Sequence, residues 1–373
     1  VMLLITNNAR LVARSLNANH QNLTGANKPP LSTPWSGAIA ETFVVQTPPL
    51  LISEIMFHPE NAPAGNTNDA DNFEFIELKN VGTNALDLTN FRLSGAIKLT
   101  LSSLTLGAGE RAVVVRDLAA FASRYGTGIT IAGTYTNQLD NAGERVRLTG
   151  PLGEPIHDFR YSPDWHPITD GHGFSLVLAE EQPAITNLPI TNNLTRNDWR
   201  PSSMRGGSPG AAEPAAPAFP NVVIQEALTH TDPPQLDSVE LHNAGATAAD
   251  LSGWFLTDDF NEPKKYRIPG GTVLAPGHYV VFDENDFNPT PGVDPSFSLS
   301  ESGEEIHLFS ADADTNLTGY VQGFSFGASF RGISFGRHVN SVGTEYFVVQ
   351  TALSLGTNNA GPRIGPVVIN EIL

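Results

Sequence analysis

The sequence predicts an all-β protein built of tandem domains. Three observations lead to this fold class. The 373-residue chain repeats a domain-sized pattern, it contains 34 glycines and 28 prolines, and only 16% of its residues are charged. Runs of strong helix formers are nearly absent. This profile is typical of many short strands joined by turns.

The repeat opens with the apolar stretch LLISEI at 50–55. This stretch recurs as VVIQEA at 222–227 and begins again as VVINEI at 367–372. Solenoid repeats have periods of about 20–50 residues and lean on their neighbours for a core. The present repeats are domain-sized, so each is expected to close its own core.

The segments that follow each opening stretch also correspond. Glu77 pairs with Glu240 and Leu88 with Leu251, each at an offset of 163 (240 − 77). We expect each pair to occupy equivalent places on equivalent strands. Both leucines are expected to be buried.

Proline-rich segments mark the domain boundaries. Pro48 and Pro49 form one linker and PAAPAFP at 214–220 forms another, since such prolines cannot continue a ladder. The predicted organisation is a C-terminal part of a β-sandwich module at 1–48, a first domain at 49–213, a linker at 214–220, a second domain at 221–361, and a linker with the first strand of a third repeat at 362–373.

Little helix is expected. LAAFASRY at 118–125 is the clearest helical turn, with Asp117 as its N-cap. The corresponding place in the second domain has only the shorter ENDFN at 284–288. The apolar runs before them, 110–117 and 278–283, are predicted to be strands.

Both repeats resemble bacterial lamin tail domains. The resemblance rests on an opening [IV]-x-E-[IA] strand at Glu54, Glu226 and Glu371, on FIELKN at 75–80 and SVELHN at 238–243, on the D-L-[ST]-x-[FW]-x-L strand at 87–93 and 250–256, and on a closing segment in each domain. It implies immunoglobulin-like β-sandwiches without catalytic machinery. It also implies an accessory module of long secreted or cell-surface bacterial proteins.

Residues 1–48 resemble a different module. NNARLVARSL at 7–16 and the WSG…TFVV pattern at 35–45 are similar to the end of the chitobiase C-terminal-like β-sandwich. The chain as given is therefore expected to be a piece of a longer polypeptide.

Charge and cysteine content exclude several kinds of partner. The formal net charge of −18 disfavours nucleic acid and anionic membrane surfaces. No run of 18 apolar residues exists, so we expect no membrane insertion. The absence of cysteine excludes thiol nucleophiles and favours a bacterial source for an extracellular protein.

The recurring glutamates allow two interpretations. Paired carboxyl groups can perform glycosidase chemistry, but the sequence indicates no substrate cleft. Buried carboxylates more often accept hydrogen bonds from backbone amides or pair with a basic residue. We therefore predict a structural role for them and no catalytic residues.

Weak candidate sites remain in the loops. Calcium prefers several oxygen ligands on a flexible loop, which makes candidates of Asp69, Asp71, Asp258, Asp259, Asp312 and Asp314, although loops of this composition are usually solvated turns. No cofactor other than such a calcium ion is expected. Trp165 and Trp199 lie near turn-rich segments and are candidates for stacking on sugars, whereas Trp254 is expected in the core.

The leading functional hypothesis is a non-catalytic structural or interaction module, acting as a spacer or assembly unit. Its expected partners are other domains or copies of the same large protein, joined by strand addition. The alternative is a carbohydrate-binding accessory region of an extracellular enzyme. The stretch 367–373 is predicted to dock on the second domain or on a neighbouring molecule, because an apolar strand without a sheet leaves unpaired backbone groups.

Overall fold

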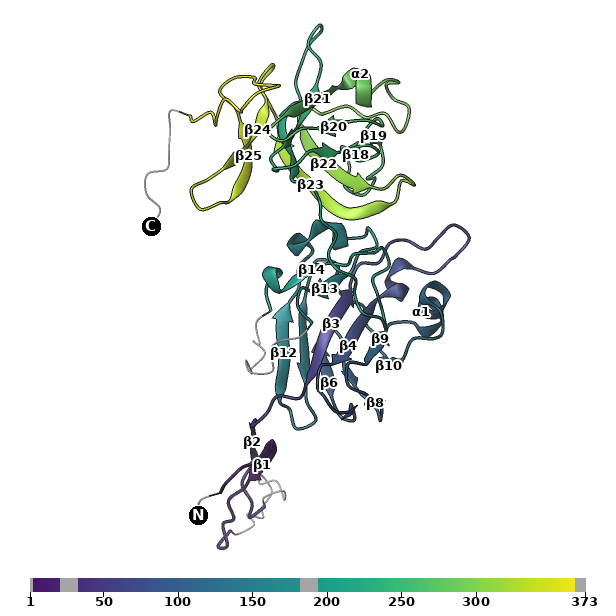
Figure 1. Cartoon of the computed structure of the whole chain (residues 1–373). Coiled ribbons are helices and arrows are strands. Elements are labelled where there is room, and N and C mark those ends of the chain that lie inside the picture. The colour runs from purple at the N-terminus through teal and green to yellow at the C-terminus, as the bar shows by residue number, and fades with distance from the viewer. Residues whose placement is uncertain (1–2, 21–32, 182–193, 366–373) are drawn as a thin grey trace, which may run out of the picture. The chain divides into compact units, whose positions relative to one another are not determined.

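The computed structural model describes residues 3–20, 33–181 and 194–365 of the chain (Figure 1). By their contacts the residues separate into two compact units, Val1–Ser202 with Gly206–Glu213 and Ser203–Arg205 with Pro214–Leu373. The prediction of an all-β fold is confirmed, since strands dominate both units and the helices are short. The terminal stretch 367–373, with Glu371, lies outside the described residues.

The first unit contains a small two-stranded sheet and a β-sandwich. Its strands are β1 (Ala9–Ala13), β2 (Ile39–Phe43), β3 (Leu50–Met56), β4 (Phe75–Asn80), β5 (Leu86–Asp87), β6 (Arg92–Gly95), β7 (Leu99–Thr100), β8 (Thr105–Leu106), β9 (Arg111–Val115), β10 (Ile131–Thr134), β11 (Arg145–Thr149), β12 (Pro155–Arg160), β13 (Leu176–Leu178) and β14 (Trp199–Pro201). Its helices are α1 (Leu118–Tyr125) and the 3-10 turns η1 (Ala70–Phe73), η2 (Pro163–Trp165), η3 (Pro167–Thr169) and η4 (Arg196–Asp198).

Two sheets form the first sandwich. The larger has the strand order β10-β9-β4-β3-β13-β14 and the smaller has the order β12-β11-β6-β7. Ile52 and Leu78 of the larger sheet and Leu93 and Leu148 of the smaller belong to one buried apolar cluster, so the core lies between the sheets. The face of the larger sheet that is turned away from this core is called the outer face below.

The second unit repeats this arrangement. Its elements are β15 (Val222–Leu228), β16 (Ser238–Asn243), β17 (Ala249–Asp250), β18 (Phe255–Thr257), β19 (Tyr266–Arg267), β20 (Val273–Leu274), β21 (Tyr279–Asp283), α2 (Glu284–Phe287), β22 (Gly303–Ala311), β23 (Leu317–Gly327), β24 (Phe335–Val339) and β25 (Glu345–Val349). The larger sheet has the order β21-β16-β15-β24-β25 and the smaller has β19-β18-β22-β23. Trp254 is 6% exposed and lies in the core, as predicted.

The strand registers confirm the duplication. Glu77 lies opposite Glu54 on β4 and β3, and Glu240 lies opposite Glu226 on β16 and β15. The predicted burial of Leu88 and Leu251 is also confirmed, as both are 0% exposed.

A β-bulge occurs at the same place in both opening strands. The register shifts between Ile52 and Glu54 in β3, and between Ile224 and Glu226 in β15. Side chains alternate between the two faces of a strand, so without the extra residue Glu54 would share the core face with Ile52. The bulge instead turns the carboxylate to the outer face, beside Glu77.

The two units differ at one edge of the larger sheet. In the first unit the expected helix α1 is present, with the Asp117 side chain accepting a hydrogen bond from the Ala120 N–H at 2.8 Å. The helix covers an outer-face cluster that includes Phe75, Val113 and Phe121. The strand β10 then pairs in parallel with β9. In the second unit the helix is a single turn and β21 ends the sheet.

Candidate functional site

The first carboxylate clamp holds the end of the first domain against its opening strand. Glu54 is 1% exposed. Its Oε1 accepts hydrogen bonds from the Ser175 hydroxyl and from the Ser208 N–H, the latter at 3.0 Å, and its Oε2 accepts from the Ser208 hydroxyl at 3.3 Å. The segment 206–213 that supplies Ser208 is called the first closing segment. One buried side chain thus fixes a segment 154 residues further along the chain.

Glu77 completes this clamp from the neighbouring strand. Its Oε2 accepts the Gly210 N–H at 2.6 Å. Its Oε1 accepts from the Ser53 hydroxyl at 2.7 Å and from Arg111 Nε at 3.1 Å. Arg111 and Lys79 also share Glu181, at 2.5 and 2.8 Å. The outer face of the first domain is therefore closed by a network of buried charges.

The second domain has the same clamp built from corresponding residues. Glu226 accepts hydrogen bonds from the Ser334 hydroxyl at 2.5 Å, the Ser354 N–H at 2.9 Å and the Ser354 hydroxyl at 2.7 Å. Glu240 Oε2 accepts from the Gly356 N–H. The segment 352–360 around them is the second closing segment. Each closing segment therefore presents a Ser-x-Gly sequence to two glutamates.

The second clamp lacks the basic partner of the first. The ladder places Tyr279 where β9 has Arg111, because His242 lies opposite Tyr279 as Lys79 lies opposite Arg111. Among the described residues, no hydrogen bond reaches Glu240 Oε1.

Burial is the largest influence on the pKa of three of these carboxyl groups, Glu54, Glu77 and Glu240. The pKa of Glu54 is raised to about 8, chiefly by desolvation and also by the nearby Glu77, against the lowering effect of the serine donors. Desolvation likewise raises the pKa of Glu77 and of Glu240 to about 7 each. Glu54 is accordingly protonated at neutral pH.

The clamps hold structure together and do not expose reactive groups. All four glutamates are at most 1% exposed, and each is covered by the segment that it binds. A substrate reaches them only if the closing segment leaves. As expected of buried carboxyl groups, Glu54 and Glu226 accept hydrogen bonds from backbone amides.

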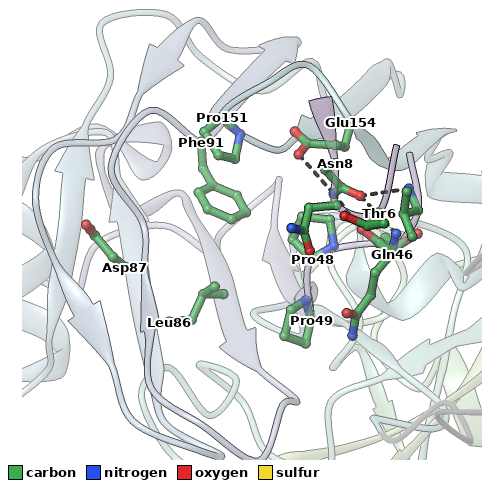
Figure 2. A pocket seen from close by; sticks show the side chains of 13 residues that line it. Thr6, Asn8, Gln46, Pro48, Pro49, Leu86, Asp87, Phe91, Pro151 and Glu154 are labelled. Atoms are coloured by element: carbon green, nitrogen blue, oxygen red, sulfur yellow. Dashed lines mark hydrogen bonds between the residues drawn. The ribbon is translucent and has the colours of Figure 1, made fainter. Parts of the chain in front are cut away.

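A cavity of about 440 Å³ lies in the first unit where the small N-terminal sheet meets the sandwich (Figure 2). Pro48, Pro49 and Phe91 supply apolar walls. Asn8 crosses one side, donating to the Gln46 carbonyl at 2.6 Å and to Glu154 Oε1 at 3.0 Å. Its own Oδ1 accepts two backbone N–H groups. Asn8 therefore ties residues 45–46 to Glu154 of the sandwich, and its own amide has no hydrogen-bonding capacity left for a ligand.

A second hollow, of about 630 Å³, lies in the second unit beside the turn after β17. Asp250, Ser252 and Arg267 line it. The Asp250 carboxylate accepts hydrogen bonds from the Ser252 N–H and hydroxyl, which lower its pKa. Arg267 donates to the Ala313 carbonyl at 3.2 Å. Asp250 and Arg267 are thus already hydrogen-bonded to other residues that line the hollow.

The prediction that Trp199 stacks on sugars is wrong. Trp199 is 2% exposed and packs against Phe159 with ring centroids 5.3 Å apart, so it presents no face to a ligand. It starts β14 and covers the core there, which the turn-rich sequence around it did not reveal. Trp165 is half-buried at the end of η2 and packs against the same core.

The carboxylates of the candidate calcium loops are engaged with nearby amides and basic side chains, except that of Asp314. Asp69 accepts the Asp71 N–H and Asp71 pairs with Arg116, Asp258 pairs with Lys265, Asp259 accepts the Asn261 N–H, Asp312 accepts the Asn316 N–H, and Asp314 is exposed. In residues 3–20, 33–181 and 194–365, no group of three or more acidic or histidine side chains could hold a metal ion. Calcium binding stays a prediction that rests on the loop sequences.

The serines of the clamps were not among the residues predicted from the sequence. The signal was present in both repeats, because GFS at 173–175 corresponds to GIS at 332–334, and SPG at 208–210 corresponds to SLG at 354–356. These short matches lie far from the opening strands that they complete.

The fold defines the class of protein, a tandem of immunoglobulin-like β-sandwiches, each closed by a buried carboxylate clamp. A family model described as Lamin Tail Domain matches residues 45–163 and 215–323, more than half of the chain. The chain belongs to this family. A comparison with curated proteins finds no match. No helix within the described part of the chain is long and apolar enough to cross a membrane.

Proposed function

We propose that this chain is a non-catalytic structural or interaction module of a large secreted or cell-surface bacterial protein. The observation that carries the proposal is the pair of clamps. The four glutamates that lie opposite one another in the larger sheets, Glu54 with Glu77 and Glu226 with Glu240, fix each domain's own closing segment. Such a module contributes length, rigidity and surface, not a reaction.

The domain organisation is part of the proposal. The first lamin tail domain spans 49–213 and the second 221–361, joined by the linker at 214–220. Residues 1–48 are the end of a preceding chitobiase C-terminal-like module, and 362–373 lead into a third repeat. Partners are then neighbouring domains or copies of the same large protein, with strand addition as the mode of contact.

The competing proposal, a carbohydrate-binding region, keeps little support. One of its two aromatic residues is buried, and the other packs partly on the core. Exposed aromatic faces are what sugar-binding sites usually supply.

Two measurements on the full chain test the proposed role. Stretching single molecules between tethered termini is expected to give two separate unfolding events, one for each sandwich. A glycan array is expected to show no saturable binding. Glycan binding that disappears in Trp165→Ala but persists in Trp35→Ala, a matched exposed tryptophan outside both sandwiches, would replace this proposal with the carbohydrate-binding one.

A further inference from the structure

The free edge of β21 is occupied at the equivalent place in the first domain. There β10 runs parallel to β9. The Thr130 carbonyl accepts the Val113 N–H at 2.9 Å, and the Tyr135 N–H donates to the Val115 carbonyl at 3.1 Å. β21 has β16 on one side, and no other strand of the described chain pairs with it on the other.

The ladders show that the backbone of β21 is ready for such a strand. Asn80 N–H bonds to the Glu110 carbonyl at 3.0 Å, and Asn243 N–H bonds to the His278 carbonyl at 3.1 Å. The hydrogen-bonded pairs of the two ladders therefore have the same phase. Because such pairs alternate in an antiparallel ladder, Val281 turns its N–H and C=O toward the free edge, as Val113 turns its own toward β10.

The outer face beside this edge is also incomplete. Val113 is 0% exposed within its cluster, whereas Val281 is 38% exposed. Ser238 stands where the first domain has Phe75, and the single turn α2 replaces the eight-residue α1. An aliphatic side chain on an added strand would cover Val281 and bury apolar area.

The acidic residues near β21 favour a basic partner strand at its free edge. Asp283, Glu284 and Asp286 lie at the C-terminal end of β21. A strand added in parallel brings its own C-terminal end beside them, where basic residues are favoured. A second copy of this chain carries a net charge of −18 and is repelled.

We propose that the free edge of β21 binds an extended segment of a separate polypeptide, added as a parallel strand. The segment has an aliphatic residue over Val281 and basic residues beside Asp283 and Glu284. This inference rests on the proposed interaction role, and at this one edge it replaces the second copy of the chain with a different, basic polypeptide as the partner.

A labelled peptide tests the edge directly. The probe is acetyl-TVTVTVKK-amide, mixed with the full chain and followed by fluorescence anisotropy. We expect saturable binding of one peptide per chain, because β10 already fills the equivalent edge in the first domain. We also expect weaker binding at high salt. The matched peptide TVTVTVEE is expected not to bind. Equal affinity for both peptides, or two peptides per chain, would overturn the proposal.

Two variants locate the site. Val281→Pro removes the outward N–H without removing a ladder bond to β16, and is expected to weaken binding by about tenfold or more. Asp283→Asn with Glu284→Gln keeps an N-cap residue for α2 and is expected to weaken binding about fivefold. Asp314→Asn, at an exposed acid in another turn of the same unit, is the charge control and should bind normally.

The remaining outcomes also decide the matter. Unchanged binding in the folded Val281→Pro variant, or in the double variant if Val281→Pro does not fold, would overturn the proposal. So would a dimer without peptide that Val281→Pro abolishes, because the occupant would then be a second copy. If the peptide does not bind the edge of β21, the proposed spacer role is unchanged. Specific glycan binding would instead contradict the spacer role, and it would not alter the result expected for the peptide.

Discussion

At the scale of residues, the glutamates of the clamps show how burial can reverse a simple expectation. Three donors surround Glu54, and donors normally stabilise the charged carboxylate. Complete removal from water outweighs them and raises the pKa of Glu54 to about 8. The group keeps its proton in the folded domain at a pH where it is ionised in the unfolded chain.

This difference predicts a pH dependence of stability. The folded pKa is above the ordinary value of 4.5, so the unfolded chain binds fewer protons between pH 4.5 and 8 and the free energy of unfolding falls as pH rises through that window. Glu54→Gln, which cannot ionise, should be more stable than the wild type at pH 8 and should lose less stability between pH 6.5 and 8.

Denaturant unfolding of both proteins at these two pH values measures the effect. Keeping the pH at 6.5 or above avoids the titration of His157, because desolvation lowers the pKa of its buried ring to about 4. That group acts in the opposite sense, because its contribution is lost as pH falls from 6.5 toward 4. Parallel stability curves for the wild type and Glu54→Gln would contradict the prediction.

At the scale of elements, the closing segments should depend on their serines. Ser208→Ala and Ser354→Ala each remove a hydroxyl that donates to a buried glutamate. Each is expected to cost about 1–3 kcal/mol and to speed amide exchange in its own closing segment alone. Hydrogen exchange on the full chain measures both.

The matched control for these variants is Ser203→Ala, a serine whose hydroxyl donates to the exposed backbone carbonyls of Pro214 and Ala215. It should leave exchange in both closing segments unchanged. If Ser208→Ala loosened the second segment as much as the first, the clamps would not be independent.

The elements also show what the sequence could and could not predict. The repeat, the strands and α1 follow from local patterns, and Asp117 marks the helix start. The bulge at Ser53 leaves a trace, since the core-facing Ile52 and Ile55 stand three residues apart where an unbroken strand would space them by two.

Other features depend on contacts that no local pattern reports. Trp199 stands among turn residues, yet it is buried because η4 leads it into β14 against Phe159. The partnership of Glu54 with Ser208 joins positions 154 residues apart. The free edge of β21 is recognised only by comparing it with β9 of the first domain, which pairs with β10.

At the scale of the whole molecule, each clamp joins the first strand of a domain to that domain's own last segment. Cleavage within the linker at 214–220 should therefore leave both domains intact. Limited proteolysis is expected to give two stable fragments, and each should unfold cooperatively with the stability that it has in the full chain. Stable fragments with cuts inside 225–355 would contradict this organisation.

The clamp also sets the order in which a domain can be completed during synthesis. Glu54 lies in the first strand, but Ser208 is made 154 residues later and Ser354 follows Glu226 by 128. At a translation rate of about 5–20 residues per second, the first glutamate waits roughly 8–30 s for its partner. Until then the emerging chain carries an apolar opening strand whose outer face has nothing to cover it. Each sandwich is thus a fold of high contact order, and such folds form slowly.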